Sequence, residues 1–223
     1  LVVGAITKVG EGSFNSILLW EFDEGLGRGV ARDQYDKIHP VPFAEYLPER
    51  EFFYPLWPEI FSMIPRDYSI GQRDTVFAVA GATAGIAICF DIVDDAIVWA
   101  MMDDGADIIF APTNNADFGQ TDQSVQQLAI ARMRAIETGR SVVNISTVGT
   151  SAVMDPTGAT LDRLPTYTEG YLLLDVPLAQ HTTPATWIKR NLEVLVGALT
   201  VAGLITAGAG AQARRGFDDP LGS

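Results

Sequence analysis

Apolar positions in the first forty residues fall into two runs that a glycine-containing turn separates. Residues 1–7 and 14–22 are rich in β-branched, leucine and aromatic side chains. Gly10 and Gly12 between them are typical of a turn that joins neighbouring strands. We therefore expect two adjacent antiparallel strands, followed by a third and more polar strand at residues 30–37.

The middle of the chain alternates short apolar runs with longer amphipathic segments. Residues 83–88 and 107–112 are continuous runs of small and β-branched residues, typical of strands that are buried on both faces. Residues 92–104 and 121–138 carry apolar side chains at helical spacing, and each segment is followed by a glycine. Further strands are predicted at residues 141–147, 150–154 and 170–176. This order predicts an α/β fold whose sheet mixes parallel and antiparallel pairs.

Residues 39–65 interrupt the alternation. They contain six of the twelve prolines and many aromatic residues, and proline disfavours the interior of a helix or strand. We expect a long loop that either lines the core or covers an apolar ligand as a lid. The aromatic candidates for contact with such a ligand are Phe52, Phe53, Tyr54, Trp57 and Phe61.

The pattern changes again near the C-terminus. Residues 194–213 contain no charged side chain, and a helix of this length is about 30 Å long, the thickness of the hydrocarbon core of a bilayer. A buried core helix is the alternative, but the segment is rich in glycine and has basic pairs at 189–190 and 214–215. The predicted organisation is a domain at residues 1–186, a membrane helix with its flanks at 187–215 and a tail at 216–223.

Composition narrows the classes of function. Lys and Arg number 15 against 28 Asp and Glu, for a net charge of −13, which argues against nucleic acid because phosphate binding requires basic side chains. One cysteine and two histidines argue against a disulfide and against a Cys- or His-based metal site, so no metal or cofactor is expected. The chain starts without methionine or a signal peptide, and we expect it to be part of a longer protein.

Cys89 is the candidate nucleophile. It directly follows the apolar run at 83–88, and α/β folds carry their chemistry at the carboxyl ends of strands. A buried structural cysteine is the alternative. The N–H of Phe90, which follows the thiol, would be one donor to an oxyanion.

Two charged residues provide the chemistry that a thiol nucleophile needs. Lys37 ends the third predicted strand, and Glu45 follows eight residues later; for the lysine, a solvated surface charge is the ordinary alternative. A carboxylate can take the proton of a thiol, and an ammonium group can stabilise the thiolate and the oxyanion of a tetrahedral intermediate. A cysteine, a lysine and a glutamate in one site would suit acyl transfer from esters and amides.

Several segments resemble the nitrilase superfamily and, within it, the apolipoprotein N-acyltransferase family. Residues 37–48, 87–91 and 111–119 match in order and spacing, and the matching helix and strand signature lies at 128–140 and 146–158. The specific part is Val-Pro-Phe-Ala-Glu-Tyr-Leu-Pro at 41–48, because soluble nitrilases share the Lys-x-His element but not this continuation. The resemblance covers nearly the whole chain.

The resemblance assigns roles to individual residues. It implies that Cys89 is the nucleophile, Lys37 the triad lysine and Glu45 an additional glutamate beside the triad. Phe90 and Asp91 stand where the best-known members have Tyr and Glu, and Asp117 stands where the family commonly has Trp. In the family the triad glutamate precedes the position of Leu1. We therefore expect this fragment to be inactive and its parent protein to be an enzyme.

The resemblance also implies a fold and a reaction. The fold is an α/β, nitrilase-like four-layer α-β-β-α sandwich, incomplete at its N-terminus, with a C-terminal transmembrane helix. The enzyme would take an acyl chain from a phospholipid as a Cys89 thioester and pass it to the N-terminal amine of a diacylated lipoprotein. It would lie in the bacterial plasma membrane with its catalytic domain on the extracytoplasmic face. The alternatives are a soluble or peripheral amidase acting on small molecules, and a non-catalytic membrane-tethered domain.

Overall fold

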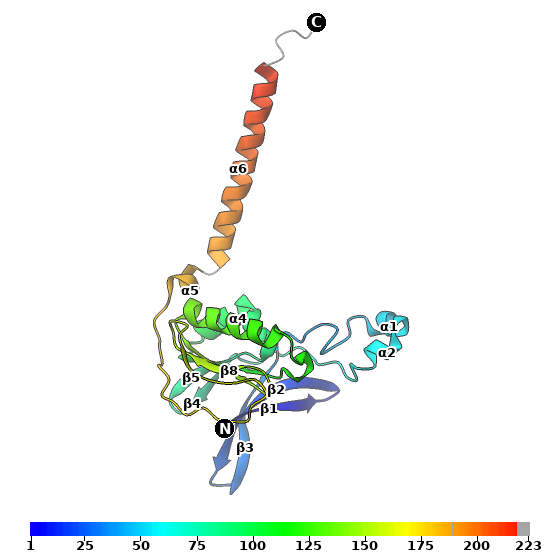
Figure 1. The fold of residues 1–223 in the computed structure, drawn as a ribbon, viewed down its shortest axis with the longest axis vertical. Coiled ribbons are helices and arrows are strands. Elements are labelled where there is room, and N and C mark those ends of the chain that lie inside the picture. Colours follow the sequence, from blue (N-terminus) through cyan, green and yellow to red (C-terminus); the bar gives the residue numbers. More distant parts are fainter. Residues whose placement is uncertain (189, 218–223) are drawn as a thin grey trace. The chain divides into compact units, whose positions relative to one another are not determined.

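The computed structural model describes residues 1–188 and 190–217. The chain divides into two units, Leu1–Thr183 and Pro184–Ser223. The first unit contains two β sheets and two longer helices (Figure 1). The second contains α5 (Pro184–Ile188) and α6 (Arg190–Phe217).

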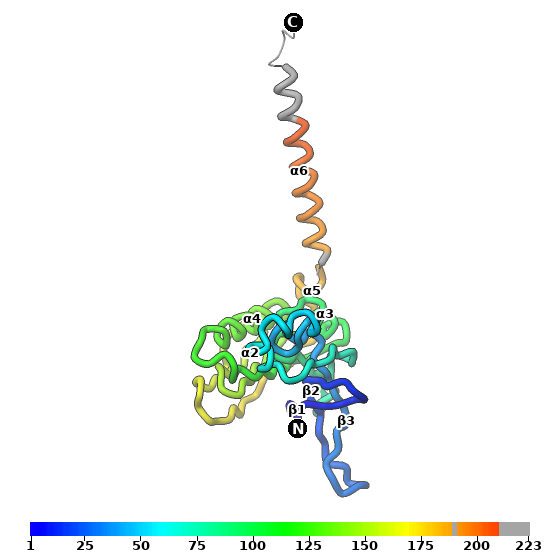
Figure 2. Tube along the Cα trace, turned by 90° about the vertical axis from the view of Figure 1, so that its right-hand side faces the viewer, coloured from blue at the N-terminus to red at the C-terminus, as the bar shows by residue number. Residues whose placement is uncertain are grey.

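The first sheet has the order β1-β2-β3 and is antiparallel throughout. Its strands are β1 (Val2–Val9), β2 (Gly12–Asp23) and β3 (Arg28–Asp36). This confirms the three strands that the first apolar runs predicted, with Gly10 at a φ of 58° in the turn between β1 and β2. The blue hairpin of β2 and β3 extends away from the rest of the first unit (Figure 2).

The second sheet has six strands in the order β4-β5-β6-β7-β8-β9. They are β4 (Val76–Val79), β5 (Ala82–Ile86), β6 (Ile108–Thr113), β7 (Ser141–Ser146), β8 (Ser151–Met154) and β9 (Thr160–Leu164). The pairs β5–β6 and β6–β7 are parallel, and the other pairs are antiparallel. The predicted mixed sheet is confirmed, and the carboxyl ends of β5, β6 and β7 share one edge.

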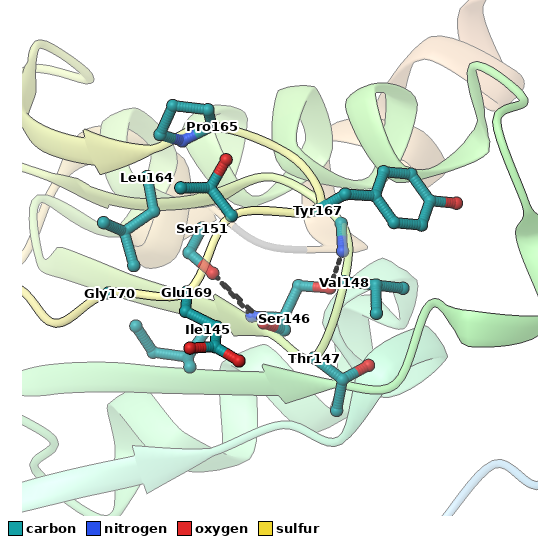
Figure 3. Close-up of a pocket in the computed structure, with 12 residues that line it drawn as sticks. Ile145, Ser146, Thr147, Val148, Ser151, Leu164, Pro165, Tyr167, Glu169 and Gly170 are labelled. Carbon is teal, nitrogen blue, oxygen red and sulfur yellow. Dashed lines mark hydrogen bonds between the residues drawn. The ribbon is translucent and has the colours of Figure 1, made fainter.

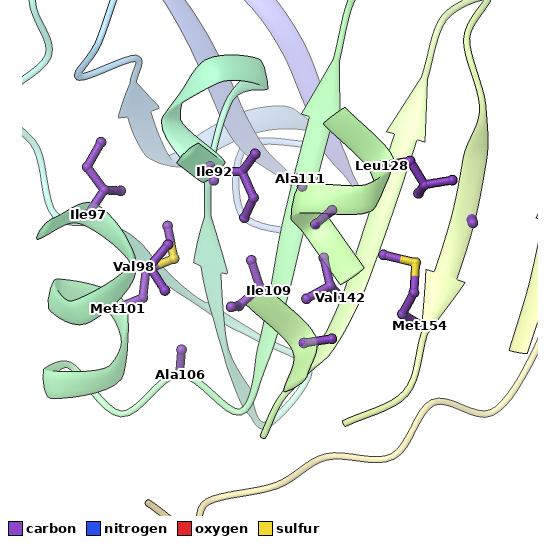
Figure 4. Close-up of a cluster of buried hydrophobic side chains, with 14 residues drawn as sticks. Ile92, Ile97, Val98, Met101, Ala106, Ile109, Ala111, Leu128, Val142 and Met154 are labelled. Atoms are coloured by element: carbon purple, nitrogen blue, oxygen red, sulfur yellow. The ribbon is translucent and has the colours of Figure 1, made fainter. Parts of the chain in front are cut away.

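Two helices cover one face of this sheet. The helix α3 (Asp95–Asp103) and the helix α4 (Gln123–Thr138) bury apolar side chains against β6, β7 and β8 (Figure 4). The predicted start of α3 at residue 92 is wrong: Asp94 is extended and accepts hydrogen bonds from the N–H groups of Ala96 and Ile97, which makes it the N-cap. The stretch before it is a separate 3-10 turn.

The other face of the six-stranded sheet packs against the three-stranded sheet. Ile17, Leu19 and Tyr35 of the smaller sheet form a buried cluster with Phe77, Ala84, Ile86, Ile88 and Ile108. Within the described residues the first unit therefore has three layers, namely helices, a six-stranded sheet and a three-stranded sheet. This is the mixed α/β arrangement that the sequence predicted, with three of the four layers of the expected α-β-β-α sandwich present in the described residues.

The predicted strand at residues 170–176 is wrong. No strand is assigned there, and Tyr171 and Leu173 are 86% and 88% exposed. The strand beside β8 is instead β9 (Thr160–Leu164), whose polar sequence gave no strand signal. Alternate side chains at 170–176 are half-buried, so the segment runs extended over the surface without joining the sheet.

The predicted proline-rich loop contains short helical turns. These are α1 (Arg50–Phe53), η1 (Tyr54–Leu56) and α2 (Pro58–Phe61). Pro55 and Pro58 lie in the first two positions of η1 and α2, where a missing N–H costs no helical hydrogen bond. The expectation of no regular element is therefore wrong for these few residues.

In the second unit, one stretch of α6, Asn191–Ala209, is long and apolar enough to cross a membrane by length and composition. Its side chains are exposed in the structure. Of the predicted flanks and tail, Lys189 and residues 218–223 lie outside the described residues.

Candidate active site

The segment that carries Cys89, the candidate nucleophile, is a strained turn that follows β5. Cys89 follows this strand by three residues and begins the 3-10 helix η2 (Cys89–Val93). Its φ is +51°, in the left-handed region that costs a residue with a side chain of the order of 1 kcal/mol. The thiol is free and partly exposed. Backbone strain of this kind is found at functional sites when the surrounding structure enforces it.

The start of η2 leaves a backbone donor beside the thiol. The first hydrogen bond of the turn runs from the N–H of Asp91 to the carbonyl of Ile88, at 3.0 Å. The N–H of Phe90 precedes it and is not used by the turn itself. A donor next to a nucleophile is what an oxyanion requires. The Phe90 ring is 46% exposed.

Lys37 and Glu45 form an ion pair. Lys37 directly follows β3 and is only 1% exposed, and its Nζ donates to Oε2 of Glu45 at 2.5 Å. The same oxygen accepts from the N–H of Val41 at 2.7 Å, and Oε1 accepts from Nδ2 of Asn15 at 3.0 Å. A buried ammonium group is tolerated because it is paired in this way.

Asp91 connects the lysine strand with the cysteine turn. It is fully buried, and its Oδ2 accepts from the hydroxyl of Tyr35 at 2.8 Å and from the N–H of Ile88 at 3.3 Å. Its Oδ1 accepts from the N–H of His39 at 2.8 Å. Burial raises the pKa of Asp91, while these hydrogen bonds and the charge of Lys37 act in the opposite direction.

Arg134 anchors the other end of the turn. From the buried face of α4, its Nε donates to the carbonyl of Ile92 at 2.9 Å and its Nη2 to that of Val93 at 2.6 Å. Asp95 and Glu137 pair with the same guanidinium group at 2.6 and 2.5 Å. Sequence analysis missed Arg134; the available signal was an arginine on the apolar face of an amphipathic helix.

The cysteine and the lysine lie in neighbouring parts of the structure. Cys89 and Ile38, the residue after Lys37, both pack against the apolar cluster between the two sheets. The charge of Lys37 also acts on Asp91, two residues after the thiol. Asp91 thus connects the Cys89 turn, which follows β5, with the segment after β3 that carries the Lys37–Glu45 ion pair.

The neighbouring strand ends carry a polar network. Buried Asn115 accepts through Oδ1 from the hydroxyls of Thr113 at 2.8 Å and Ser146 at 3.1 Å. Asn114 accepts from the hydroxyl of Thr147 at 2.7 Å. These bonds connect the ends of β6 and β7. Asp117, at the position where the family commonly has Trp, is exposed.

A cavity of about 270 Å³ lies at the end of β7. It is enclosed by the β7–β8 loop and residues 164–170, with Ser146, Ser151 and Glu169 among its lining residues (Figure 3). Cys89 and Lys37 are not among them. The cavity therefore lies beside the cysteine site on the same sheet, and does not contain it.

The aromatic residues of the loop divide into two groups. Phe61 is buried with Leu47 and Ile64 in a small separate core, and Phe53 packs against it. Phe52, Tyr54 and Trp57 are 65%, 37% and 60% exposed. The apolar residues Leu56, Ile60 and Met63 of the same segment are also exposed.

The described residues contain no cluster of three or more His, Cys, Asp or Glu side chains that could hold a metal ion. The groups available for chemistry are a thiol, an ammonium group, carboxylates and backbone N–H groups, a set suited to covalent acyl transfer.

The carbon-nitrogen hydrolase family model matches residues 1–183. The chain belongs to the carbon-nitrogen hydrolase family. The matched range contains every residue of the cysteine site and ends before α6, so the family domain and the apolar helix are successive parts of the chain.

Curated relatives of this carbon-nitrogen hydrolase chain include apolipoprotein N-acyltransferases. That of Mycolicibacterium smegmatis is 34% identical over 82% of this chain and 30% of the relative. That of Shewanella oneidensis is 27% identical over 92% of this chain and 41% of the relative. The chain thus spans well under half the length of these two relatives.

Solved structures show the same fold at low identity. A carbon-nitrogen hydrolase from Helicobacter pylori has a TM-score of 0.55 and 18% identity, over 76% of this chain and 59% of that chain. An amidase from Nesterenkonia, which carries acrylamide on its active-site cysteine, has a TM-score of 0.55 and 18% identity, over 88% of this chain and 68% of that chain.

Proposed function

We propose that the protein containing this chain is an N-acyltransferase of lipoprotein maturation. An acyl chain from a phospholipid would be carried on Cys89 as a thioester and passed to the N-terminal amine of a diacylated lipoprotein. The observation that carries the chemistry is the strained Cys89 turn, which Asp91 connects to the segment of the buried Lys37–Glu45 pair. The names of the curated relatives support the choice of substrates.

In the first half of the reaction, the Cys89 thiolate attacks the ester carbonyl of the phospholipid. A C–S bond forms, the ester C–O bond breaks, and the lysophospholipid leaves after taking a proton. The Phe90 N–H and the Lys37 ammonium group stabilise the oxyanion. In keeping with the family resemblance, we propose that the carboxylate that takes the thiol proton comes from a segment upstream of Leu1.

In the second half, the amine of the lipoprotein attacks the thioester carbonyl. A C–N bond forms and the C–S bond breaks, which releases the Cys89 thiolate for another cycle. The general base that accepted the thiol proton now accepts a proton from the amine. Glu45 holds the Lys37 ammonium group in place in both halves, because its own carboxylate is fixed by hydrogen bonds from Val41 and Asn15.

The apolar surfaces support substrates with long alkyl chains. Phe52, Trp57 and Met63 expose apolar side chains on the segment at residues 43–64 of the first unit. The helix α6 contains a stretch suited to a bilayer. We propose that the protein lies in the bacterial plasma membrane with its catalytic domain on the extracytoplasmic face, and that the exposed rings contact lipid.

Acyl transfer from a labelled phospholipid tests the proposal. The full-length protein, in lipid nanodiscs, is mixed with phospholipid that carries a radiolabelled acyl chain, without acceptor, and the adduct is mapped by peptide mass spectrometry. Label is expected on the peptide containing Cys89, labile to hydroxylamine, and absent in Cys89→Ala. Label that persists in Cys89→Ala, or turnover of small amides without any transfer from phospholipid, would contradict the proposal and favour an amidase.

A further inference from the structure

Tyr35 lies on β3, and its side chain makes a hydrogen bond to the turn that begins at Cys89. Among the hydrogen bonds of the described residues, no other side chain of β3 does so. It donates to Oδ2 of Asp91 at 2.8 Å, and both residues are 0% exposed. Tyr35 precedes Lys37 by two residues, so the two side chains leave the chain on the same side. This hydrogen bond connects the side chains of β3 to the cysteine turn.

The Asp91 carboxylate also accepts hydrogen bonds from backbone groups close to Lys37 and Cys89. It accepts from the N–H of His39, two residues after Lys37, and from the N–H of Ile88, directly before Cys89. Three donors from two separate segments therefore meet on one buried carboxylate. Breaking one of them leaves a buried acceptor short of a partner, which costs more than an exposed hydrogen bond does.

The Cys89 turn needs support of this kind. A φ of +51° is not the preferred conformation of a cysteine, and a strained turn persists only where its surroundings enforce it. Arg134 secures the carbonyl end of η2 through Ile92 and Val93. The end that carries the thiol is secured by Asp91.

We infer that Tyr35 is a positioning residue. Through Asp91, its hydroxyl holds the Cys89 turn in a fixed position relative to Lys37. The catalytic importance of this role rests on the proposed acyl transfer. Tyr35 touches neither substrate nor the reacting atoms. It sets the geometry between the nucleophile and the ammonium group that stabilises the oxyanion, so its loss lowers the rate of the chemical step more than it weakens substrate binding.

The first arm of the test uses the full-length protein in detergent and needs no substrate. Hydrogen exchange is followed by mass spectrometry in peptides that cover residues 35–41 and 86–94. Tyr35→Phe keeps the ring and removes only the hydroxyl, and it is expected to speed exchange in both peptides about tenfold, the factor for one lost buried hydrogen bond.

Ser141→Ala is the matched control. Ser141 is 0% exposed and donates its hydroxyl to the carbonyl of Pro177 at 2.7 Å, at the start of β7 and thus at the opposite edge of the sheet. It also loses one buried hydroxyl, so it is expected to leave exchange in residues 35–41 and 86–94 unchanged. Equal exchange in Tyr35→Phe and Ser141→Ala at these peptides would overturn the inference.

The second arm uses the full-length protein and single-turnover thioester formation. Tyr35→Phe is expected to lower the rate at saturating phospholipid at least tenfold with the half-saturating concentration unchanged, whereas Ser141→Ala keeps the wild-type rate. Asp91→Asn provides the second side of a double-mutant cycle, and the double variant is expected to be no slower than the slower single variant. Additive losses, or a loss confined to the half-saturating concentration, would refute the positioning role.

The two arms separate the two ideas. If the wild-type protein forms no thioester, the proposed function fails, while the exchange arm still reports whether Tyr35 holds the turn. If thioester forms on Cys89 and Tyr35→Phe behaves like Ser141→Ala in both arms, the proposed function stands and the positioning role is wrong.

Discussion

The cysteine site and the aromatic projection at residues 43–64 are built in opposite ways. Lys37 and Asp91 are 1% and 0% exposed and are held by distinct hydrogen bonds. The projection has a core of only three buried residues, and it leaves Phe52 and Trp57 at 65% and 60% exposed. Fixed geometry suits a reaction centre, whereas exposed apolar rings suit contact with partners that vary in shape, such as lipid.

The largest effect that tests this difference is expected from Lys37. Lys37→Met keeps the apolar stem but removes the ammonium group, so thioester formation in the full-length protein is expected to fall about a thousand-fold. Lys8→Met is the control, because Lys8 is exposed on β1 of the same three-stranded sheet. Quenched-flow measurement of labelled acyl-enzyme gives both rates. Similar rates for the two variants would remove Lys37 from the chemistry.

The next effect separates the two groups of aromatic residues. Phe61→Ala removes a buried ring and is expected to destabilise the projection by about 3 kcal/mol, which limited proteolysis within residues 43–64 measures. Trp57→Ala removes an exposed ring and is expected to leave proteolysis unchanged while raising several-fold the phospholipid concentration for half-maximal thioester formation in the full-length protein. An unchanged half-saturating concentration in Trp57→Ala would show that the exposed rings do not contact the lipid substrate.

Arg134 tests how firmly the cysteine turn is held. Arg134→Met leaves two backbone carbonyls and two carboxylates without their donor, so the free energy of unfolding is expected to fall by about 3 kcal/mol. Arg132→Met, on a less buried position of the same helix, is expected to cost about 1 kcal/mol. Urea unfolding measures both; an equal loss would mean that the anchor of η2 is no stronger than a surface contact.

The smallest effect concerns pH. Burial raises the pKa of Asp91 in the folded state, so its contribution to stability is complete below the pKa of the unfolded chain and is lost as pH rises through the folded pKa. The melting temperature of wild type relative to Asp91→Asn is therefore expected to increase as pH falls from 7 toward 4. Thermal unfolding by circular dichroism at several pH values measures the difference, and a difference that stays constant with pH would contradict a raised pKa of Asp91 in the folded state.

The elements that the sequence predicted are those with a regular pattern of apolar residues. The strands β1 to β3, the parallel strands β5 to β7 and the helix α4 follow apolar runs or helical spacing that burial requires. The polar strand β9 and the extended residues 170–176 were interpreted wrongly. Which of two neighbouring segments joins β8 depends on tertiary pairing, and no local pattern records it.

The site was predictable to the same extent. Cys89, Lys37 and Glu45 could be singled out because their side chains suit one reaction and their spacing resembles a family. Tyr35 and Arg134 could not, since a tyrosine in a strand and an arginine in a helix are ordinary residues until their burial and partners are known.

The most direct test of the proposed acyl transfer is the identity of the acylated residue. Full-length protein is incubated with a phospholipid that carries a labelled acyl chain, and the adduct is located by peptide mass spectrometry before acceptor is added. We expect one hydroxylamine-labile acyl group on Cys89, the only cysteine of these 223 residues. This acyl group is expected to disappear when a diacylated lipopeptide with a free N-terminal amine is added. An acyl group on another residue, or a Cys89 adduct that the lipopeptide does not discharge, would contradict it.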